Sequence, residues 1–324
     1  MRSLDRRHFL TTAAIAAAGL AATQNLCAHA ADAPTAEHPF KTKLHRAWMG
    51  GTNEKQYAEI AEAGFDGLET TTWDIDPDKA AEVRKMADTL GLKIHSVLRG
   101  WTNFNNADAF DADVKSVERT LKAAEAYGAD AILLVPCRTG VAGPAAGKFD
   151  IECDAAGNMK RAVAGDNTPY EAYIAAQNEA NEATRRAMDK LIPVAEKTGV
   201  VIALENVWNG LWCMPEIFAR FIRSFDSPWV KCYYDVGNHV KYAKPEEWIE
   251  SLGKLIVKVH IKDFKLDDTG YDGDWAHPRD GSVNWPNVRR LLDQLGYNGW
   301  LTIEDGGLPL VEFRERLDLI IAGK

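Results

Sequence analysis

Residues 196–206 read Glu-Lys-Thr-Gly-Val-Val-Ile-Ala-Leu-Glu-Asn, and this stretch contains the unit that decides the fold. A polar helical segment ends at Gly199, because glycine commonly terminates helices. The apolar run 200–204 follows, as expected for a strand that is buried on both faces. The run then stops at Glu205 and Asn206. A helix, a glycine, a buried strand and a polar end, in this order, predict a parallel sheet covered by helices.

The same unit occurs eight times along the chain. The predicted strands are 44–49, 67–71, 93–98, 131–137, 200–206, 230–236, 255–262 and 300–305. The predicted helices are 55–63, 78–90, 111–127, 169–198, 215–224, 245–252, 286–295 and 310–321. Eight parallel strands close a barrel, so we predict an α/β fold with a single (β/α)8 TIM barrel over residues 44–324. A doubly wound open sheet is the alternative, but no G-x-G-x-x-G follows the first strand.

Residues 138–167 interrupt this repeat after the fourth predicted strand. They are rich in glycine, alanine and polar residues, and they form a longer loop than compact domains usually contain. Loops of this length usually serve a function, so we expect a lid or a rim over the site.

Residues 1–30 are predicted to be an export signal. A basic start at 6–10 leads into an alanine-rich apolar stretch that ends in Ala-His-Ala at 28–30, which is the layout of a cleaved signal. The paired arginines resemble a twin-arginine signal, although Asp5 stands where serine or threonine is usual. A membrane anchor is disfavoured, because the apolar run is shorter than the roughly 20 residues of a span. We therefore expect a periplasmic or other extracytoplasmic protein, with 31–43 as a linker.

The composition limits the classes of partner. Of 324 residues, 46% are hydrophobic and 26% are charged, with 38 Lys and Arg against 47 Asp and Glu. The formal net charge of −9 disfavours nucleic acid, whose phosphates such a protein repels. No stable membrane span is expected in the mature form. Barrels of this kind often dimerise, which leaves a homo-oligomer open.

Four consecutive predicted strands, the fifth to the eighth, carry side chains that bind metals. These are Glu205, Asp235, His260 and Glu304. In a barrel the carboxyl ends of the strands form the active site, and charges buried there need a common counter-charge. Three carboxylates and one imidazole suit Mn²⁺ best, with Mg²⁺, Co²⁺ or Zn²⁺ as alternatives. His260 also needs a partner for its second ring nitrogen, for which Asp263 and Lys262 are candidates.

Five motifs occur in order along these strand ends. They are L-E-N at 204–206, D-V-G-N at 235–238, H-x-K-D at 260–263, the segment 281–285 and G-Y-x-G-W-L-x-I-E at 296–304. In these motifs the chain resembles the sugar phosphate isomerase/epimerase superfamily, which has the xylose isomerase-like TIM barrel and includes ketose 3-epimerases. The resemblance implies that the four residues named above bind the metal. It also implies that Glu205 and Glu304 act as the catalytic acid/base pair.

This set of residues supports proton abstraction next to a carbonyl. A metal stabilises the resulting enediolate, while Glu205 and Glu304, on opposite sides of the barrel mouth, take and return the proton. We therefore predict a metal-dependent sugar isomerase or epimerase. The alternatives are a metal-dependent lyase or hydratase that acts on keto-sugars or keto-glycosides, and a carbohydrate-binding barrel without catalysis.

Eight further side chains are candidates for binding the carbohydrate substrate: Glu69, His95, Trp101, Trp208, Asn238, His239, Lys262 and Arg279. Tryptophan faces suit the CH-rich faces of sugar rings, and as a group they favour an uncharged carbohydrate. Asn238 stands where ketose 3-epimerases often have a substrate-binding histidine. Purely structural roles are the alternatives: a strand-end salt bridge for Glu69, a buried barrel histidine for His95, loop packing for each tryptophan and a solvated arginine for Arg279.

Overall fold

The structure, a computed structural model, describes residues 40–51 and 53–324. The predicted export signal and most of the predicted linker lie outside the described residues. Within the described part of the chain, no helix combines the length and the apolar character that crossing a membrane requires.

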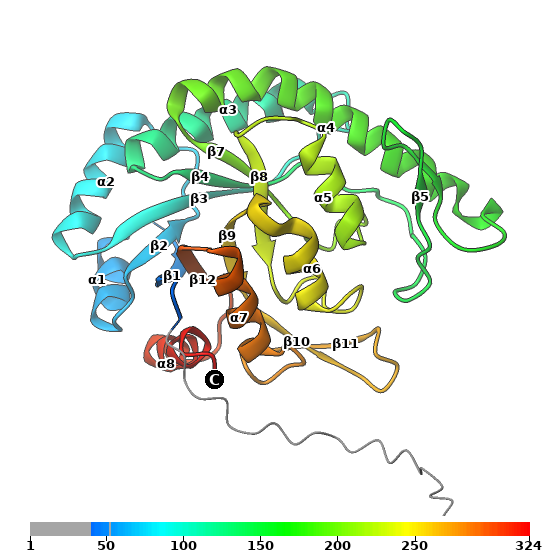
Figure 1. Cartoon of the computed structure of the whole chain (residues 1–324). Coiled ribbons are helices and arrows are strands. Elements are labelled where there is room, and N and C mark those ends of the chain that lie inside the picture. Colours follow the sequence, from blue (N-terminus) through cyan, green and yellow to red (C-terminus); the bar gives the residue numbers. More distant parts are fainter. Residues whose placement is uncertain (1–39, 52) are drawn as a thin grey trace, which may run out of the picture. The chain divides into compact units, whose positions relative to one another are not determined.

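Eight parallel strands form a closed barrel in the order β1-β12-β9-β8-β7-β4-β3-β2 (Figure 1). Their bounds are β1 Leu44–Gly50, β2 Gly67–Thr70, β3 Lys93–Trp101, β4 Ala131–Val135, β7 Val201–Glu205, β8 Val230–Asp235, β9 Ile256–Ile261 and β12 Gly299–Ile303. The ring closes where β1 pairs with β12, with Leu44 opposite Gly299 and Trp48 opposite Ile303. The predicted single (β/α)8 barrel is therefore confirmed.

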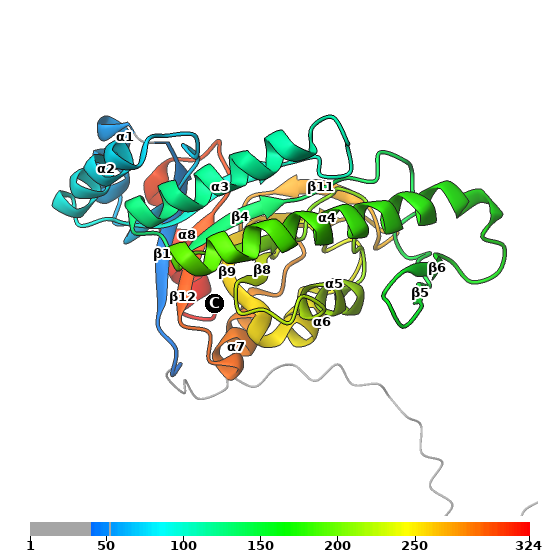
Figure 2. The ribbon, with the colours of Figure 1, turned by 90° about the horizontal axis from the view of Figure 1, so that it is seen from above.

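Helices alternate with the barrel strands and lie around their outside (Figures 1 and 2). Their bounds are α1 Glu54–Glu62, α2 Pro77–Thr89, α3 Phe110–Tyr127, α4 Glu171–Thr198, α5 Pro215–Arg223, α6 Pro245–Leu252, α7 Trp285–Leu295 and α8 Leu310–Ile321. Helices α3, α4 and α7 end at Gly128, Gly199 and Gly296, whose φ angles of 77°, 69° and 73° are left-handed. Glycine adopts this conformation without the steric penalty that a Cβ imposes, so each helix ends where the sequence predicts.

The interior of the barrel combines an apolar layer with buried polar side chains. Leu133, Val135, Ala203 and Tyr233 pack together there. Lys258 is 3% exposed and forms an ion pair with Asp130 at the amino-terminal end of β4. The interior is thus filled by side chains, and the carboxyl ends of the strands are left to form the site.

Two hairpins that the sequence analysis did not predict follow barrel strands. One lies within 138–167 and pairs β5 Glu152–Cys153 with β6 Met159–Arg161. The other follows β9 directly and pairs β10 Asp263–Leu266 with β11 Gly273–Ala276. The first half of the long loop lies at the rim, because a Cβ at Gly147 would be 2.5 Å from the Tyr271 ring.

The second half of the long loop packs against helices and not over the barrel mouth. Asn178 of α4 accepts a hydrogen bond from the Met159 N–H, and Arg220 of α5 donates to the Asp154 carbonyl. The expected lid or rim is therefore limited to the residues before β5.

Candidate active site and metal centre

Glu205, Asp235, His260 and Glu304 come together at the carboxyl ends of β7, β8, β9 and β12. One ligand atom of each lies within 4.8 Å of the others. His260 Nδ1 is 2.6 Å from Glu304 Oε2, 3.6 Å from Glu205 Oε1 and 3.9 Å from Asp235 Oδ2. Strand pairing explains the proximity, since Asp235 lies opposite His260 in the parallel register of β8 and β9.

Two asparagines orient the first two carboxylates. Asn206 Oδ1 accepts from the Asp235 N–H at 2.8 Å, and its Nδ2 donates to the Asp235 carbonyl at 2.8 Å. Asp235 Oδ1 accepts from the N–H groups of Gly237 and Asn238, at 2.9 and 2.7 Å. Asn238 Nδ2 donates to Glu205 Oε1 at 3.2 Å. Asp235 Oδ1 therefore stabilises the turn that follows β8, and Oδ2 is directed at the cluster.

The cluster holds more negative charge than its side chains can balance. Burial raises the pKa of Glu205 to about 7 and also raises the pKa of Asp235. Burial opposes ionisation of Glu304 too, but the adjacent His260 and Lys262 hold the pKa of Glu304 at about 2. Burial alone would lower the pKa of His260, yet the Glu304 and Glu69 carboxylates raise it well above its ordinary value. Protons or a cation must therefore supply positive charge.

A divalent metal ion fits this cluster. Three of its buried atoms, Asp235 Oδ2, His260 Nδ1 and Glu304 Oε2, make no hydrogen bond of good geometry, although Nδ1 and Oε2 lie 2.6 Å apart. Buried polar atoms are normally paired, so three such atoms that converge on one point suit a shared cation. A histidine that binds a metal is neutral, so the three carboxylates and the one ammonium group, Lys262, leave two formal negative charges for the ion. Oxygen-rich donor sets with one imidazole bind divalent cations.

Glu69 lies beneath this cluster and does not line a pocket. It is fully buried on β2, with Oε2 at 2.6 Å from His260 Nε2 and Oε1 accepting from Ser96 Oγ at 2.7 Å. Both oxygens are thus occupied by protein groups, and contact between Glu69 and a substrate stays a prediction. The partner of His260 Nε2 is Glu69, and not Asp263 or Lys262, the candidates for the second ring nitrogen.

The two other histidines of the candidate set are also directed away from the mouth. His95 is 4% exposed, with Nε2 at 3.1 Å from Thr302 Oγ1 and its ring stacked 4.6 Å from Trp300. These contacts agree with the alternative of a buried barrel histidine. His239 Nε2 donates to the Val207 carbonyl at 3.0 Å, and its ring packs 4.9 Å from Trp248. Substrate binding by His95 and His239 stays a prediction.

His239 leads to a prediction on acid stability. Burial lowers its pKa to about 4, whereas that of an unfolded histidine is roughly 6.5. Between these two values the unfolded chain binds a proton that the folded protein does not. The free energy of unfolding therefore decreases as the pH is lowered, and it is about 2 kcal/mol smaller at pH 5 than at pH 7. Urea unfolding measures this free energy at pH 7 and at pH 5. The loss between the two pH values should be about 2 kcal/mol smaller in His239→Gln than in the wild type. An equal decrease in both proteins would contradict the assignment of a buried, neutral His239.

The remaining candidates lie at the rim of the cluster. Lys262 Nζ is 2.9 Å from Glu304 Oε2 and 3.5 Å from Asn238 Oδ1. Trp208 is 39% exposed, and its indole N–H donates to the Asn238 carbonyl. Trp101 is 40% exposed beneath the Arg138 guanidinium. Their contact with a substrate stays a prediction.

Arg279 lies in a loop that Asp263 organises. The Asp263 carboxylate accepts from the N–H groups of Phe264, Arg279 and Val283, and from the Trp285 indole. Arg279 itself is exposed and has a left-handed φ of 80°. Its exposure agrees with the alternative of a solvated loop residue.

Gly281 leads to a prediction on this loop. A Cβ at Gly281 would lie 2.0 Å from Asp263 Oδ1, so Gly281→Ala must displace the carboxylate that holds the loop. We expect a loss of about 2 to 3 kcal/mol in the free energy of unfolding, measured by urea titration. Gly306→Ala is the matched control, because its Cβ would meet nothing within 4 Å. Equal stability of the two variants would contradict the role of Asp263.

Further residues lie around the site beside the eight candidates. Trp275 is half-exposed and its ring lies 5.0 Å from that of Trp208. His277 Nδ1 is 2.8 Å from Asp305 Oδ2, and this pair connects β11 to the end of β12. Trp275 carried a signal, since it follows a strand end. The His277–Asp305 pair carried none, because the hairpin that presents His277 was not predicted.

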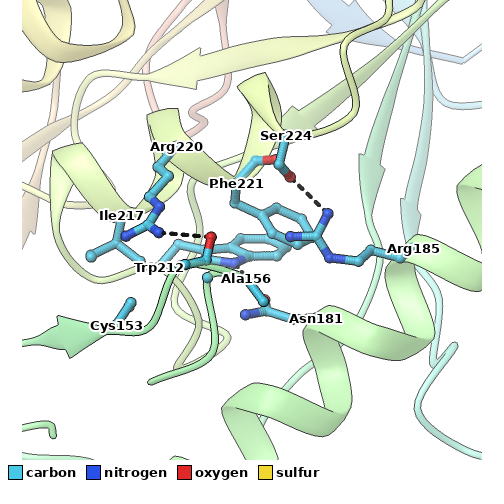
Figure 3. A pocket seen from close by; sticks show the side chains of 11 residues that line it. Cys153, Ala156, Asn181, Arg185, Trp212, Ile217, Arg220, Phe221 and Ser224 are labelled. Carbon is cyan, nitrogen blue, oxygen red and sulfur yellow. Dashed lines mark hydrogen bonds between the residues drawn. The ribbon is translucent and has the colours of Figure 1, made fainter. Parts of the chain in front are cut away.

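A small cavity of about 60 Å³ lies away from the cluster, between β5, α4 and α5 (Figure 3). Trp212 forms its wall and donates from Nε1 to Asn181 Oδ1 at 2.9 Å, while Arg185 donates to Ser224 Oγ at 2.7 Å. Ligand pockets usually measure about 300 Å³ or more. This cavity therefore does not compete with the cluster as a site for a sugar.

Known proteins share this architecture. The family model described as "Xylose isomerase-like TIM barrel" matches residues 57–320. An uncharacterised protein of Methanocaldococcus jannaschii is 28% identical over 124 residues, which are 36% of this chain and 41% of that protein. The match thus spans about two fifths of the curated relative.

Two solved structures share the fold. The 3-keto-D-glucoside 4-epimerase of E. coli, in its apo form, has a TM-score of 0.61 and 17% identity, over 86% of this chain and 99% of that one. The IOLI protein, solved with a binding zinc atom, has a TM-score of 0.65 and 16% identity, over 86% of this chain and 98% of that one. At such identities the likeness shows the fold alone. The match of the family model over most of the chain shows the family: this chain belongs to the xylose isomerase-like TIM barrel family.

Proposed function

We propose that this protein is a divalent-metal-dependent sugar isomerase or epimerase that abstracts a proton from a carbon next to a carbonyl. The observation that carries the proposal is the presence of two glutamates, Glu205 and Glu304, in one cluster with Asp235 and His260. β7 and β12 are separated in the barrel by β8 and β9, so the two glutamates approach the cluster from different sides. The E. coli neighbour with this fold is named as an epimerase, which supports the reaction class.

The two glutamates transfer the proton in this proposal. Each has its own hydrogen-bonding or charged neighbour: Asn238 Nδ2 donates to Glu205, and Lys262 Nζ lies 2.9 Å from Glu304. One carboxylate takes the proton from carbon, and the other returns a proton to the same or the adjacent carbon. When bound, the metal ion polarises the substrate carbonyl and stabilises the negative charge of the enediolate. Lys262 adds a positive charge beside the reacting oxygens.

The proposed substrate is an uncharged carbohydrate. Trp208 and Trp275 present half-exposed indole rings beside Lys262, whose Nζ is 5.6 Å from the Trp275 ring. Aromatic faces bind sugar CH groups, and ammonium groups donate to hydroxyls. Mn²⁺ is the proposed ion, with Mg²⁺, Co²⁺ and Zn²⁺ as alternatives. We also propose that the protein is exported through its twin-arginine signal.

Solvent exchange tests this proposal. The protein lacking residues 1–30 is loaded with Mn²⁺ and incubated in D₂O with free ketoses, aldoses and keto-glycosides, and NMR follows deuterium incorporation and products. Exchange into a sugar with an intact carbon skeleton is expected. Release of water or of an aglycone would instead establish the lyase or hydratase alternative. Bound metal without exchange in any sugar would leave the non-catalytic barrel.

A further inference from the structure

We infer that Glu69 is a positioning residue for the metal site: it holds His260 with Nε2 protonated, so that Nδ1 is the nitrogen presented to the ion. The inference rests on the proposed metal site and assigns a role to a fifth strand, β2. None of the four predicted ligands comes from this strand.

The contact between Glu69 and His260 fixes the state of the imidazole ring. Glu69 Oε2 lies 2.6 Å from His260 Nε2, and both side chains are 0% exposed. A separation of 2.6 Å is a hydrogen bond, in which the ring nitrogen donates to the carboxylate oxygen, so Nε2 carries the proton. In a neutral imidazole the other nitrogen then has a free lone pair. That nitrogen, Nδ1, faces the three carboxylates of the cluster, at 2.6 Å from Glu304, 3.6 Å from Glu205 and 3.9 Å from Asp235.

The pairing of β2 with β3 places Ser96 beside Glu69. It runs from Leu68 opposite Ile94 to Glu69 opposite Ser96, so His95 of β3 is the extra residue at the register shift. An extra residue of this kind changes which residue of its strand lies opposite the partner strand. Here Glu69 meets both Ser96 Oγ, which donates at 2.7 Å, and His260.

Stability alone is a poor explanation for this buried carboxylate. All four residues of β2 are buried, and a hydrophobic side chain of similar volume is often as stable as a buried ion pair. A carboxylate behind a metal-binding histidine instead orients the ring and strengthens its lone pair as a donor. The two roles differ in one measurable quantity, the affinity for metal.

Calorimetric titration with Zn²⁺ measures that affinity in the wild type and in matched variants. Glu69→Gln keeps an acceptor for Nε2–H but loses the charge, and we expect affinity to fall about 10-fold. Glu69→Leu also loses the acceptor, and a fall of about 100-fold is expected. His95→Gln is the control, since it changes another buried imidazole of the interior whose Nε2 contacts Thr302. Its affinity should equal that of the wild type.

Nitrogen NMR of the Zn²⁺-loaded, ¹⁵N-histidine-labelled protein reads the ring state directly. In the wild type we expect His260 to bind Zn²⁺ through Nδ1, with a slowly exchanging proton on Nε2. In Glu69→Leu this proton should exchange faster. If Glu69→Leu does not fold, Ser96→Ala is the milder variant, with an expected loss of about threefold in affinity.

The outcomes separate the two proposals. A wild type that binds no divalent ion would overturn both the proposed function and this inference. Normal binding by the wild type and undiminished binding by the Glu69 variants would overturn the inference alone. Coordination of Zn²⁺ through Nε2 would overturn it as well.

Discussion

Glu205→Gln is expected to slow deuterium exchange by about 10³-fold while the barrel stays folded. Glutamine has the size of glutamate but cannot accept a proton from carbon. It keeps an oxygen that can accept from Asn238 Nδ2, which donates to Glu205 Oε1 at 3.2 Å in the native protein. The loss should therefore appear in the chemical step and not in folding. NMR measures exchange at saturating metal, and thermal unfolding reports on the fold.

Glu179→Gln is the matched control for this variant. Glu179 is exposed on α4, so its replacement makes the same chemical change away from the cluster, and unchanged exchange is expected. If Glu205→Gln exchanged deuterium at the rate of the control, Glu205 would have no part in proton transfer. The acid/base pair would then have to be sought elsewhere at the barrel mouth.

Asp235→Asn is expected to weaken metal binding by about 100-fold or more, with activity restored by excess Mn²⁺. The two oxygens of Asp235 have separate tasks. Oδ1 accepts from two N–H groups of the following turn, which the oxygen of asparagine can still do. Oδ2 is buried without a partner in the cluster, and there asparagine would place an amide nitrogen, which is not a ligand. Calorimetry measures the affinity, and exchange rates at rising Mn²⁺ concentration measure the rescue.

Saturation with metal separates binding from chemistry in this variant. Asp235 has no proton-transfer role in the proposal, so the exchange rate at saturating Mn²⁺ should approach that of the wild type. A rate that stays low at full metal occupancy would show that Asp235 also acts on the substrate. Unchanged metal affinity would remove it from the ligand set.

The sequence predicted the barrel closely, because each strand is a buried run and several helices end at glycine. The fifth predicted strand, 200–206, is β7 Val201–Glu205 in the structure. The four cluster residues could be predicted to converge, since the carboxyl ends of parallel strands meet at one end of a barrel. The two hairpins could not be predicted as readily, because their strands are short and mostly polar.

Side-chain direction was the part that the sequence could not predict. Glu69 lies near the end of β2 as Glu205 lies at the end of β7, but Glu69 contacts Nε2 of His260, whereas Glu205 lies near Nδ1. His239 follows Asn238 directly, yet the turn after β8 directs Asn238 to Glu205 and His239 to Trp248. Such differences depend on local backbone geometry, which residue types at strand ends do not reveal.

The order of the strands has a consequence for how the site is assembled. The four cluster residues lie at the ends of β7, β8, β9 and β12, which are consecutive neighbours in the ring. The pairing of β12 with β9 puts Thr302 opposite His260, so this contact brings Glu304 to the cluster, and the pairing of β1 with β12 is not required for it. A metal ion bound by all four residues therefore links four adjacent strands, and by mass action it stabilises the state in which they are paired.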